Sequence, residues 1–384
     1  MKKSVVSLTA SILTGGITSF VLISYYFSGN RQFENLALGT QTVSYFAVNK
    51  NKKPVHIQKV NDEEETEFLY QTKKNKKTLL ILGNSQTHSI NQKKEMDVNY
   101  IELLNKKWDT SNINVVCHSL PNAGLQEFYL SYKYWKNKFN ISYIIIPLFM
   151  DDLREDGIRD VFFFNLVKSK FQLTDTSNDI SKKINKDLQG YWSRNENTKS
   201  NDDNEDMAAL KETVQETTET YFNQILNSNW TLWQNRPNVR GDFFNWLYKA
   251  RNTVLGINAN TVRKMIPQRY EYNMHALELI IEDCIKSNIK VLLYIPPIRS
   301  DVTIPYDEND YSKFKSAIEN LTLRYPNKVF YKNFESIIPE NLWGYKEATN
   351  LIDNREIDFM HFQFKGHQIL ADSLQPFISK LIQE

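Results

Sequence analysis

The sequence has only two cysteines, Cys117 and Cys284. Two thiols cannot make the multi-bridge framework that stabilises small secreted domains, and neither lies at a spacing typical of a metal site. We expect both thiols to be buried in the core, with a single disulfide as the alternative. The sequence also lacks a glycine-rich phosphate loop, a dinucleotide-binding glycine pattern and a cluster of metal ligands, so no cofactor is expected.

No excess of one charge is present either. The 384 residues include 47 Lys and Arg against 45 Asp and Glu, which gives a formal net charge of +2. The two signs are interspersed, so no basic face predicts a nucleic-acid partner. Hydrophobic residues make up 41% of the chain, which is enough for one large domain or two smaller ones with a substantial core.

Charged residues are absent from an N-terminal stretch that runs from Ser4 to about Phe27, directly after Lys2 and Lys3. Its length suits a helix that crosses a bilayer, and no small-residue cleavage site follows it. We therefore predict an uncleaved transmembrane anchor over 1–27, with a signal peptide as the alternative. The two lysines would stay in the cytoplasm, so the rest of the protein would be extracytoplasmic.

The segment 28–77 is polar and is interpreted as a partly structured stalk and entry segment, and one domain follows at 78–384. Short apolar runs are typical of buried parallel strands, and amphipathic patterns predict helices between them. The predicted strands are 78–82, 113–117, 143–148, 290–295 and 328–331, and the predicted helices are 100–107, 125–138, 272–287, 310–325 and 366–382. This alternation predicts a three-layer α/β/α domain around a parallel sheet, with the working groups at the carboxyl ends of the strands.

The alternation stops between about 160 and 270, and we interpret this block as a large insertion. Its first half, 174–220, is rich in polar and charged residues, which predicts a mobile segment with a partly helical stretch at 206–226. Its second half, 230–247, is rich in tryptophan and phenylalanine. Those aromatic side chains predict either a small local core or a surface on which sugars stack.

A serine follows the first predicted strand, in the segment Gly83-Asn84-Ser85-Gln86-Thr87. At the first turn of a helix, the N–H of Ser85 would point outward and could stabilise an oxyanion, and Gly83 would allow a tight turn. The same pattern also suits an ordinary helix N-cap. It is not the Gly-x-Ser-x-Gly elbow of the α/β-hydrolases, because Thr87 stands where the second glycine would be.

A carboxylate and a histidine occur together near the C-terminus, in Asp358-Phe359-Met360-His361. Three residues apart in a turn or a helical coil, their side chains would share one face. Asp358 could then hold the Nδ1–H of His361, which leaves Nε2 to take the proton of Ser85. A serine, a histidine and a carboxylate are the groups needed for acyl transfer through a serine ester.

With these residues in this order, the chain resembles the SGNH (GDSL-like) hydrolase superfamily. The first block of that family is similar to 83–87, its loop glycine after the second strand matches Gly124 in Pro121-Asn122-Ala123-Gly124, and its last block is similar to 358–361. The resemblance covers about 78–160 and 270–384 and implies a flavodoxin-like three-layer fold. The predicted anchor makes the chain most similar to the membrane-anchored cell-envelope branch, DltD-like or AlgJ-like, of the bacterial cytoplasmic membrane.

The resemblance implies a role for each matched residue. Ser85 would be the nucleophile, His361 its base and Asp358 the group that orients the base. The N–H groups of Ser85 and Gly124 would form the oxyanion hole.

The chain departs from the family after the third strand. The family has an asparagine donor there, whereas this sequence reads Met150-Asp151-Asp152. An ionised Asp151 would repel an oxyanion, so either Asp151 has another role or the third donor comes from Asn84 or Asn122 in the pocket. Loss of one such donor raises the activation free energy by about 3 kcal/mol, and a weak hydrolase can still be a competent transferase.

Four further polar residues lie near these motifs. His118 could line the pocket or be a buried, hydrogen-bonded histidine. His88 could lie at the pocket rim, although a helix-surface position is more common, and His367 is expected to face solvent or the insertion. Arg154 could bind an anionic polymer, but a surface salt bridge is the simpler expectation.

Two functions of different classes follow. The first is an anchored, extracytoplasmic serine esterase or O-acyltransferase. Its substrate would be an acyl group, with acetyl favoured, on a cell-envelope polysaccharide, teichoic acid or lipopolysaccharide. A transferase of this kind would need a membrane partner that exports the acyl group. The second is a non-catalytic scaffold or polysaccharide-binding protein on the same fold, which the missing asparagine and the long insertion favour.

Overall fold

The computed structural model describes residues 41–58, 65, 67–69, 77–108, 113–159, 171–199 and 246–383. The chain divides into two compact units, of which the larger comprises Gln41–Thr198, Ala259–Lys346 and Ile357–Glu384. The described part of the smaller unit is 199, 246–258 and 347–356. The predicted anchor over 1–27 lies outside the described residues. Among the helices that are described, none combines the length and the apolar character that a membrane crossing requires.

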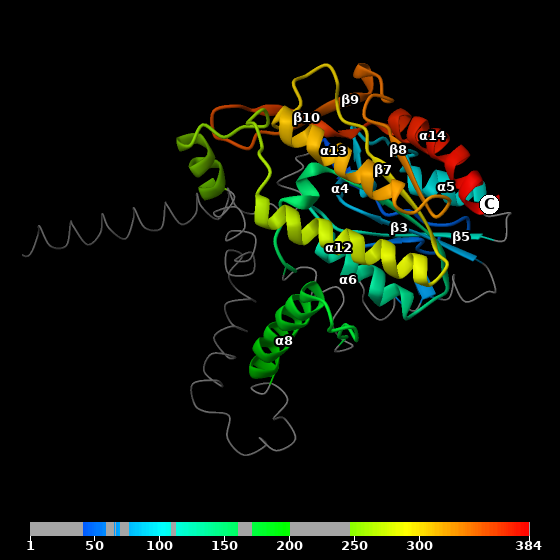
Figure 1. Ribbon diagram of the computed structural model, residues 1–384. Helices are drawn as coiled ribbons and strands as arrows, with labels where there is room; N and C mark the ends of the chain where they lie inside the picture. Colours follow the sequence, from blue (N-terminus) through cyan, green and yellow to red (C-terminus); the bar gives the residue numbers. More distant parts are fainter. Residues whose placement is uncertain are drawn as a thin grey trace, which may run out of the picture. The chain divides into compact units, whose positions relative to one another are not determined.

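The larger unit is built on a six-stranded parallel sheet (Figure 1). The strand order is β2-β5-β3-β6-β7-β8, and every neighbouring pair is parallel. The strands are β2 (His56–Ile57), β3 (Lys77–Gly83), β5 (Ile113–Ser119), β6 (Ile141–Pro147), β7 (Lys290–Ile295) and β8 (Val329–Asn333). The parallel sheet and its five predicted strands are confirmed, with small differences at the strand ends.

The edge strand β2 comes from the segment that was predicted to be a stalk. It pairs with β5, and β1 (Thr42–Ser44) pairs with β4 (Ser89–Asn91) in a separate antiparallel ladder. Residues 42–57 are therefore part of the α/β domain rather than of a stalk. Strands of two or three residues are too short to show a periodic pattern of hydrophobic residues, so the sequence does not reveal them.

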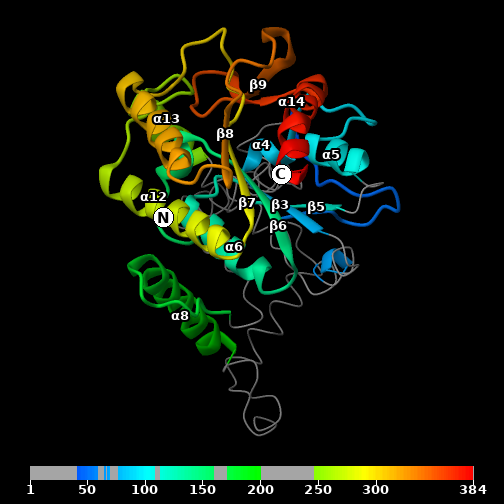
Figure 2. The same ribbon diagram turned by 45° about the vertical axis from the view of Figure 1, so that its right-hand side comes forward.

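Helices cover both faces of the sheet (Figures 1 and 2). They are α5 (Tyr100–Trp108), α6 (Leu125–Lys136), α12 (Pro267–Lys286), α13 (Glu308–Leu323) and α14 (Phe364–Gln383). The helices α6, α12 and α13 share one core with strand residues such as Leu80 and Leu293. The helices α5 and α14 share the opposite core with Leu79 and Leu292. Because successive side chains of a strand point to opposite faces, each strand contributes to both cores, as a three-layer fold requires.

The polar segment 174–220 differs from its prediction. Its described part contains the helix α8 (Asp179–Lys199), where the sequence predicted a mobile segment. The high polar content conceals an apolar stripe, because Ile180, Ile184 and Leu188 recur every four residues and are fully buried. The predicted helical stretch 206–226 and most of the aromatic half lie outside the described residues, and Trp246 at its end is exposed.

The two cysteines are free and buried. Cys117 on β5 belongs to one core and Cys284 on α12 to the other, so the prediction of two buried thiols is confirmed and the alternative disulfide does not form. Burial raises the pKa of both thiols, to about 12 for Cys284. Both side chains are therefore neutral core residues.

The carboxyl ends of the strands bring the site residues together. β3 and β5 end in register, with Gly83 opposite Ser119, and β6 pairs with β3 on the other side. The segments that follow these three strands carry Ser85, Gly124 and Asp151. The parallel sheet thus places three distant parts of the sequence at one edge.

Candidate active site

Ser85 is the first residue of α4, a helix of four residues that begins directly after β3 and ends at His88. Asn84 caps this helix, since its side chain accepts a hydrogen bond from the N–H of Gln86 at 3.1 Å. In the part of the chain that the structure describes, the N–H of Ser85 has no hydrogen-bond partner. The nucleophile candidate therefore carries an unused backbone donor beside its hydroxyl group.

The position of α4 is fixed by a close approach at Gly83 and by the side chain of Gln86. A Cβ added at Gly83 would lie 2.2 Å from Thr87 Oγ1, so only glycine lets the end of the strand approach the helix this closely. Gln86 Nε2 donates to the carbonyl oxygen of Pro297 at 2.8 Å and to that of Met360 at 2.6 Å. Gln86 therefore ties the serine turn to the segment after β7 and to the strand that carries the histidine.

Asp358 and His361 lie on β10 (Arg355–Phe362), which pairs with β9 (Trp343–Glu347). The sequence predicted a turn or a helical coil here, and that prediction is wrong. In a regular strand, residues three apart point to opposite faces. Here the Asp358 carboxylate accepts hydrogen bonds from the N–H groups of Met360 and His361, each at 3.0 Å, which draws the Asp358 side chain along the strand towards His361.

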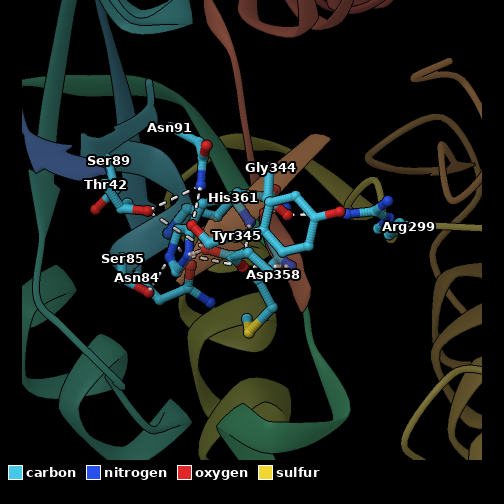
Figure 3. A network of polar contacts seen from close by, with 12 residues as sticks. Thr42, Asn84, Ser85, Ser89, Asn91, Arg299, Gly344, Tyr345, Asp358 and His361 are labelled. Carbon is cyan, nitrogen blue, oxygen red and sulfur yellow. Dashed lines mark hydrogen bonds and ion pairs between the residues drawn. The ribbon is translucent and has the colours of Figure 1, made fainter. Parts of the chain in front are cut away.

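Ser85, His361 and Asp358 form a continuous line of hydrogen bonds (Figure 3). His361 Nε2 lies 3.0 Å from Ser85 Oγ, and His361 Nδ1 lies 2.9 Å from Asp358 Oδ2. Because a carboxylate only accepts, the imidazole carries its hydrogen on Nδ1 and presents Nε2 as the acceptor for the serine hydroxyl. Ser85 and His361 are each 6% exposed, so the reacting atoms are shielded from bulk water but not sealed from it.

The Asp358 carboxylate is negatively charged at neutral pH. Burial raises the pKa of this group, but the attraction and hydrogen bonds of His361 and the charge of Lys346 outweigh burial, and the pKa falls to about 2. Thr42 Oγ1 donates to Asp358 Oδ2 at 3.5 Å, and Asn91 Nδ2 donates to Thr42 Oγ1 at 2.9 Å. The small β1–β4 ladder thus supplies a hydrogen-bond donor to the Asp358 carboxylate (Figure 3).

The second expected oxyanion donor has another partner. The N–H of Gly124 donates to Glu127 Oε2 at 3.0 Å, and Glu127 accepts from Arg159 Nε at 2.9 Å and Nη2 at 2.6 Å. An amide that already bonds a carboxylate does not stabilise a second anion, so in this arrangement Gly124 is a helix cap for α6 rather than an oxyanion donor. The signal was in the sequence, because a glutamate three residues after a cap is typical of a capping box.

Asp151 does not present an unpaired charge to the site. Its Oδ2 contacts Arg263 Nη1 and accepts from the hydroxyl of Tyr306 at 3.1 Å, while its Oδ1 accepts from Arg154 Nη1 at 3.3 Å. The salt-bridge interpretation of Arg154 is confirmed. The repulsion that the sequence predicted between Asp151 and an oxyanion is offset by two guanidinium groups.

The residue after it, Asp152, holds the serine turn, and the sequence reasoning missed it. Its Oδ1 accepts from Asn84 Nδ2 at 3.0 Å and its Oδ2 from the N–H of Phe149 at 2.9 Å. Burial raises the pKa of Asp152 well above its usual range. Its position directly after the third predicted strand could have marked it, because that is where the site residues gather. Asn84 therefore links two strand ends and uses one amide hydrogen to do so.

The other two pocket candidates lie apart. His118 is buried, with Nδ1 2.5 Å from Ser131 Oγ and 3.1 Å from Trp135 Nε1, so it is a hydrogen-bonded core residue rather than a pocket wall. Asn122 is exposed and adopts a left-handed conformation with φ of 50°, which asparagine tolerates. No group of three or more potential metal ligands occurs within the described ranges.

His88 and His367 are buried, contrary to the prediction of surface positions. His88 Nδ1 lies 2.7 Å from Ser119 Oγ, and His367 Nε2 lies 3.2 Å from the carbonyl oxygen of Ser89. Burial lowers the pKa of each histidine to about 3, so both are neutral. A helix of four residues has no periodicity from which the burial of His88 could be predicted.

No protein-family model matches the chain, and no curated protein matches it. Several solved structures are similar to it. A putative acylhydrolase from Bacteroides fragilis is 10% identical over 83% of this chain and 96% of its own, with a TM-score of 0.35. The psychrotrophic esterase EstA from Pseudoalteromonas sp. is 12% identical over 80% of this chain and 99% of its own, with a TM-score of 0.35. A GDSL-like lipase from Bacteroides thetaiotaomicron is 10% identical over 79% of this chain and 88% of its own, with a TM-score of 0.33.

Proposed function

We propose that this protein is a serine esterase or O-acyltransferase of the SGNH type, with Ser85 as its nucleophile. The observation that carries the proposal is the line from Ser85 Oγ to His361 Nε2 at 3.0 Å and from His361 Nδ1 to Asp358 at 2.9 Å. A base within hydrogen-bond reach of a serine, itself oriented by a carboxylate, is the arrangement that activates the hydroxyl group. The buried histidines His56, His88 and His367 have no carboxylate as a hydrogen-bond partner among the described residues.

The chemistry follows from these positions. Ser85 Oγ attacks the carbonyl carbon of an ester while its proton passes to His361 Nε2, and Asp358 stabilises the imidazolium that forms. The free N–H of Ser85 donates to the developing oxyanion. His361 then gives the proton to the leaving alkoxide as the C–O bond breaks, which leaves an acyl ester on Ser85. Water or a sugar hydroxyl attacks this ester with His361 again as the base.

For the finer function, we propose an acetyl group on a cell-envelope polysaccharide, teichoic acid or lipopolysaccharide, handled outside the bacterial cytoplasmic membrane. The support is the uncharged N-terminal stretch of the sequence and the resemblance to anchored envelope members. A transferase would receive its acyl group from an exporting membrane partner. A C-terminal fusion to a reporter enzyme that is active only outside the cytoplasm tests the topology, and an inactive reporter on a stable fusion would contradict it.

The nucleophile is tested by covalent labelling. A fluorescent fluorophosphonate should label the wild-type protein and should fail to label Ser85→Ala. Ser119→Ala is a matched control, because Ser119 also contacts histidine nitrogens but is buried in β5. Labelling of Ser85→Ala as strong as that of wild type would remove Ser85 from the role of nucleophile.

One observation favours the alternative of a non-catalytic, polysaccharide-binding scaffold. The N–H of Gly124 is bonded to Glu127, which leaves the proposed oxyanion hole one donor short. A scaffold would bind glycan equally well as wild type and as the double variant Ser85→Ala, His361→Ala, and neither form would hydrolyse 4-nitrophenyl acetate. Turnover of this ester by wild type, lost in the double variant, would exclude the scaffold.

A further inference from the structure

A charged cluster contacts the strand that carries Asp358 and His361, and the mechanism above does not use it. The Asp151 carboxylate contacts Arg263 through Oδ2 and Arg154 through Oδ1. Two guanidinium groups face one carboxylate, so the cluster keeps one excess positive charge. All three side chains are about a quarter exposed, so a ligand can reach them.

Arg263 is held against the strand that carries the catalytic histidine. Its guanidinium group lies over the ring of Phe359, 4.9 Å from the ring centroid, and Phe359 is two residues before His361. Its backbone is fixed as well, because its N–H donates to Pro305 O and its carbonyl accepts from the N–H of Asp307, each at 3.0 Å. Ring stacking, the ion pair and the backbone bonds together set the orientation of the guanidinium plane.

Arg263 has hydrogen-bond donors left over. Its contact with Asp151 uses Nη1, and no partner of Nε or Nη2 occurs among the residues the structure describes. Arg299, which is labelled in Figure 3, has a partner at each of its three nitrogens, since its Nε and Nη2 donate to Asp301 at 2.6 and 2.8 Å and its Nη1 donates to Gly344 O at 2.9 Å. A free Nε–Nη2 fork binds the two oxygens of a carboxylate or phosphate through parallel hydrogen bonds.

We propose that Arg263 binds an anionic group of the substrate, a carboxylate or a phosphate, while the ester lies at Ser85. This inference rests on the proposed esterase function and adds the substrate class, an acylated acidic polymer rather than a neutral one. Asp151, which stands where an asparagine donor was expected, then orients Arg263. Arg263 is a specificity-determining residue and takes no part in the proton transfers.

The test compares charged and neutral esters. The substrates are 4-nitrophenyl acetate, O-acetylated xylo-oligosaccharide, O-acetylated oligogalacturonate and O-acetylated glycerol-phosphate oligomer. Arg263→Gln should raise KM about 10- to 100-fold for one or both charged polymers, the range expected when a charge-assisted pair of hydrogen bonds is lost. It should change kcat/KM for both neutral esters by less than about threefold. Arg263→Lys keeps the charge without the fork and should recover part of the affinity.

Arg324→Gln is the matched control, because Arg324 pairs only with Glu278 in the described contacts, has a side chain that is 60% exposed, and lies away from the catalytic strand at the end of α13. This variant should behave as wild type on all four substrates. An effect on the galacturonate alone assigns a carboxylate to the Arg263 site, and an effect on the glycerol phosphate alone assigns a phosphate.

Two outcomes would overturn the inference: an unchanged KM for both charged polymers, or an equal loss on charged and neutral esters. If Arg263→Gln does not fold, salt replaces it as the probe. Raising NaCl from about 0.05 to about 0.5 M should then raise the wild-type KM for the charged polymers only, because salt screens a partly exposed ion pair, and a uniform response would contradict the inference. Failure of the proposed function is separate, since it would appear either as no turnover of any ester by wild type or as full activity of Ser85→Ala.

Discussion

Among the described residues, a serine hydroxyl lies within hydrogen-bond distance of a histidine at three places, and the comparison of two of them, at Ser85 and at Ser119, is the informative one. Ser85 Oγ is 3.0 Å from His361 Nε2. Ser119 Oγ is 2.6 Å from His56 Nε2 and 2.7 Å from His88 Nδ1. The contacts of Ser119 are the shorter ones, yet the chemistry that we propose belongs to Ser85.

The two places differ in the hydrogen-bond partner of the second ring nitrogen of the histidine. Asp358 accepts from His361 Nδ1, whereas Asn99 Nδ2 donates to His56 Nδ1 at 3.4 Å. That donor leaves the hydrogen of His56 on Nε2, so His56 donates to Ser119 and Ser119 donates onward to the next imidazole. Without a carboxylate no imidazolium is stabilised, and Ser119 is only 1% exposed. A serine–histidine contact therefore becomes reactive only when a carboxylate and access to substrate come with it.

The largest effect is expected when the carboxylate is removed from the first place. Asp358→Asn should lower kcat for 4-nitrophenyl acetate by about 10³- to 10⁴-fold, because the amide can hold the imidazole in the wrong tautomer and cannot stabilise its positive charge. Steady-state kinetics with the purified variant measure this loss. The folded structure should survive, since the amide keeps the size of the carboxylate.

Asn99→Ala makes the corresponding change in the second place. It should leave kcat within about threefold of wild type while it lowers the melting temperature, because a buried hydrogen-bonded group is lost. An Asp358→Asn enzyme that keeps more than about a tenth of wild-type kcat, or an Asn99→Ala enzyme that loses as much activity, would erase the distinction between the two places.

The sequence predicted the place at Ser85 better than the place at Ser119, because the signals for Ser85, Asp358 and His361 are local in the sequence. Short apolar runs marked the strands, and the position of Ser85 after a run and the spacing of Asp358 and His361 marked the residues that the structure brings together. The burial of His88 on α4 has no local signal, because it depends on packing against Ser119 on β5. The same holds for Asp151, whose partner Arg263 is 112 residues away.

Sequence reasoning also missed what very short elements do. The strands β1 and β2 have three and two residues, yet they supply Thr42 behind Asp358 and His56 beside Ser119. Both histidine environments are therefore completed by a segment whose composition suggested a stalk and a partly structured entry segment. β2 is stabilised by pairing with the main sheet and β1 by pairing with β4, and no periodic pattern in the segment itself predicts either pairing.

An intermediate effect is expected from Asn84, which positions the serine without reacting. Asn84→Ala removes the cap of α4 and the bond to Asp152, so the free energy of unfolding should fall by about 1–3 kcal/mol. We expect kcat to fall about 10- to 100-fold, because the hydroxyl group of Ser85 is no longer held in line with its base. Urea unfolding and steady-state kinetics on the same preparation measure the two quantities.

Asn105→Ala separates positioning from stability. Asn105 Nδ2 donates to the carbonyl oxygen of Val115 at 3.1 Å in the core below α5, and it contacts no triad residue in the described structure. This variant should lose a similar stability and keep its kcat. Equal losses of kcat in both variants would mean that Asn84 acts through stability alone.

The smallest effect on catalysis and a distinct effect on acid stability are expected at His88. Burial lowers the pKa of His88 to about 3, below the 6.5 of the unfolded chain, so the unfolded state binds a proton that the folded state does not. Proton uptake by His88 in the unfolded state therefore lowers the free energy of unfolding as the pH falls from about 6.5 towards 3, by up to about 1.4 kcal/mol per pH unit.

Asp358 affects the stability at lower pH. Its pKa of about 2 lies below the usual 3.8, so its stabilisation of the folded state is lost between about pH 4 and pH 2.

His88→Asn can keep a hydrogen-bond acceptor near Ser119 but does not titrate. Urea unfolding at pH 7, 6, 5 and 4 should show a shallower fall in the free energy of unfolding than in wild type, by about 1 kcal/mol per pH unit, while kcat at pH 7 stays within about threefold. Asp358→Asn should alter the slope below about pH 4, where the wild-type carboxylate takes up its proton. If instead His88→Asn has the wild-type slope, His88 is protonated in the folded state. In that case His88 cannot accept a hydrogen bond from Ser119, and the order of donors and acceptors given above for His56, Ser119 and His88 is wrong.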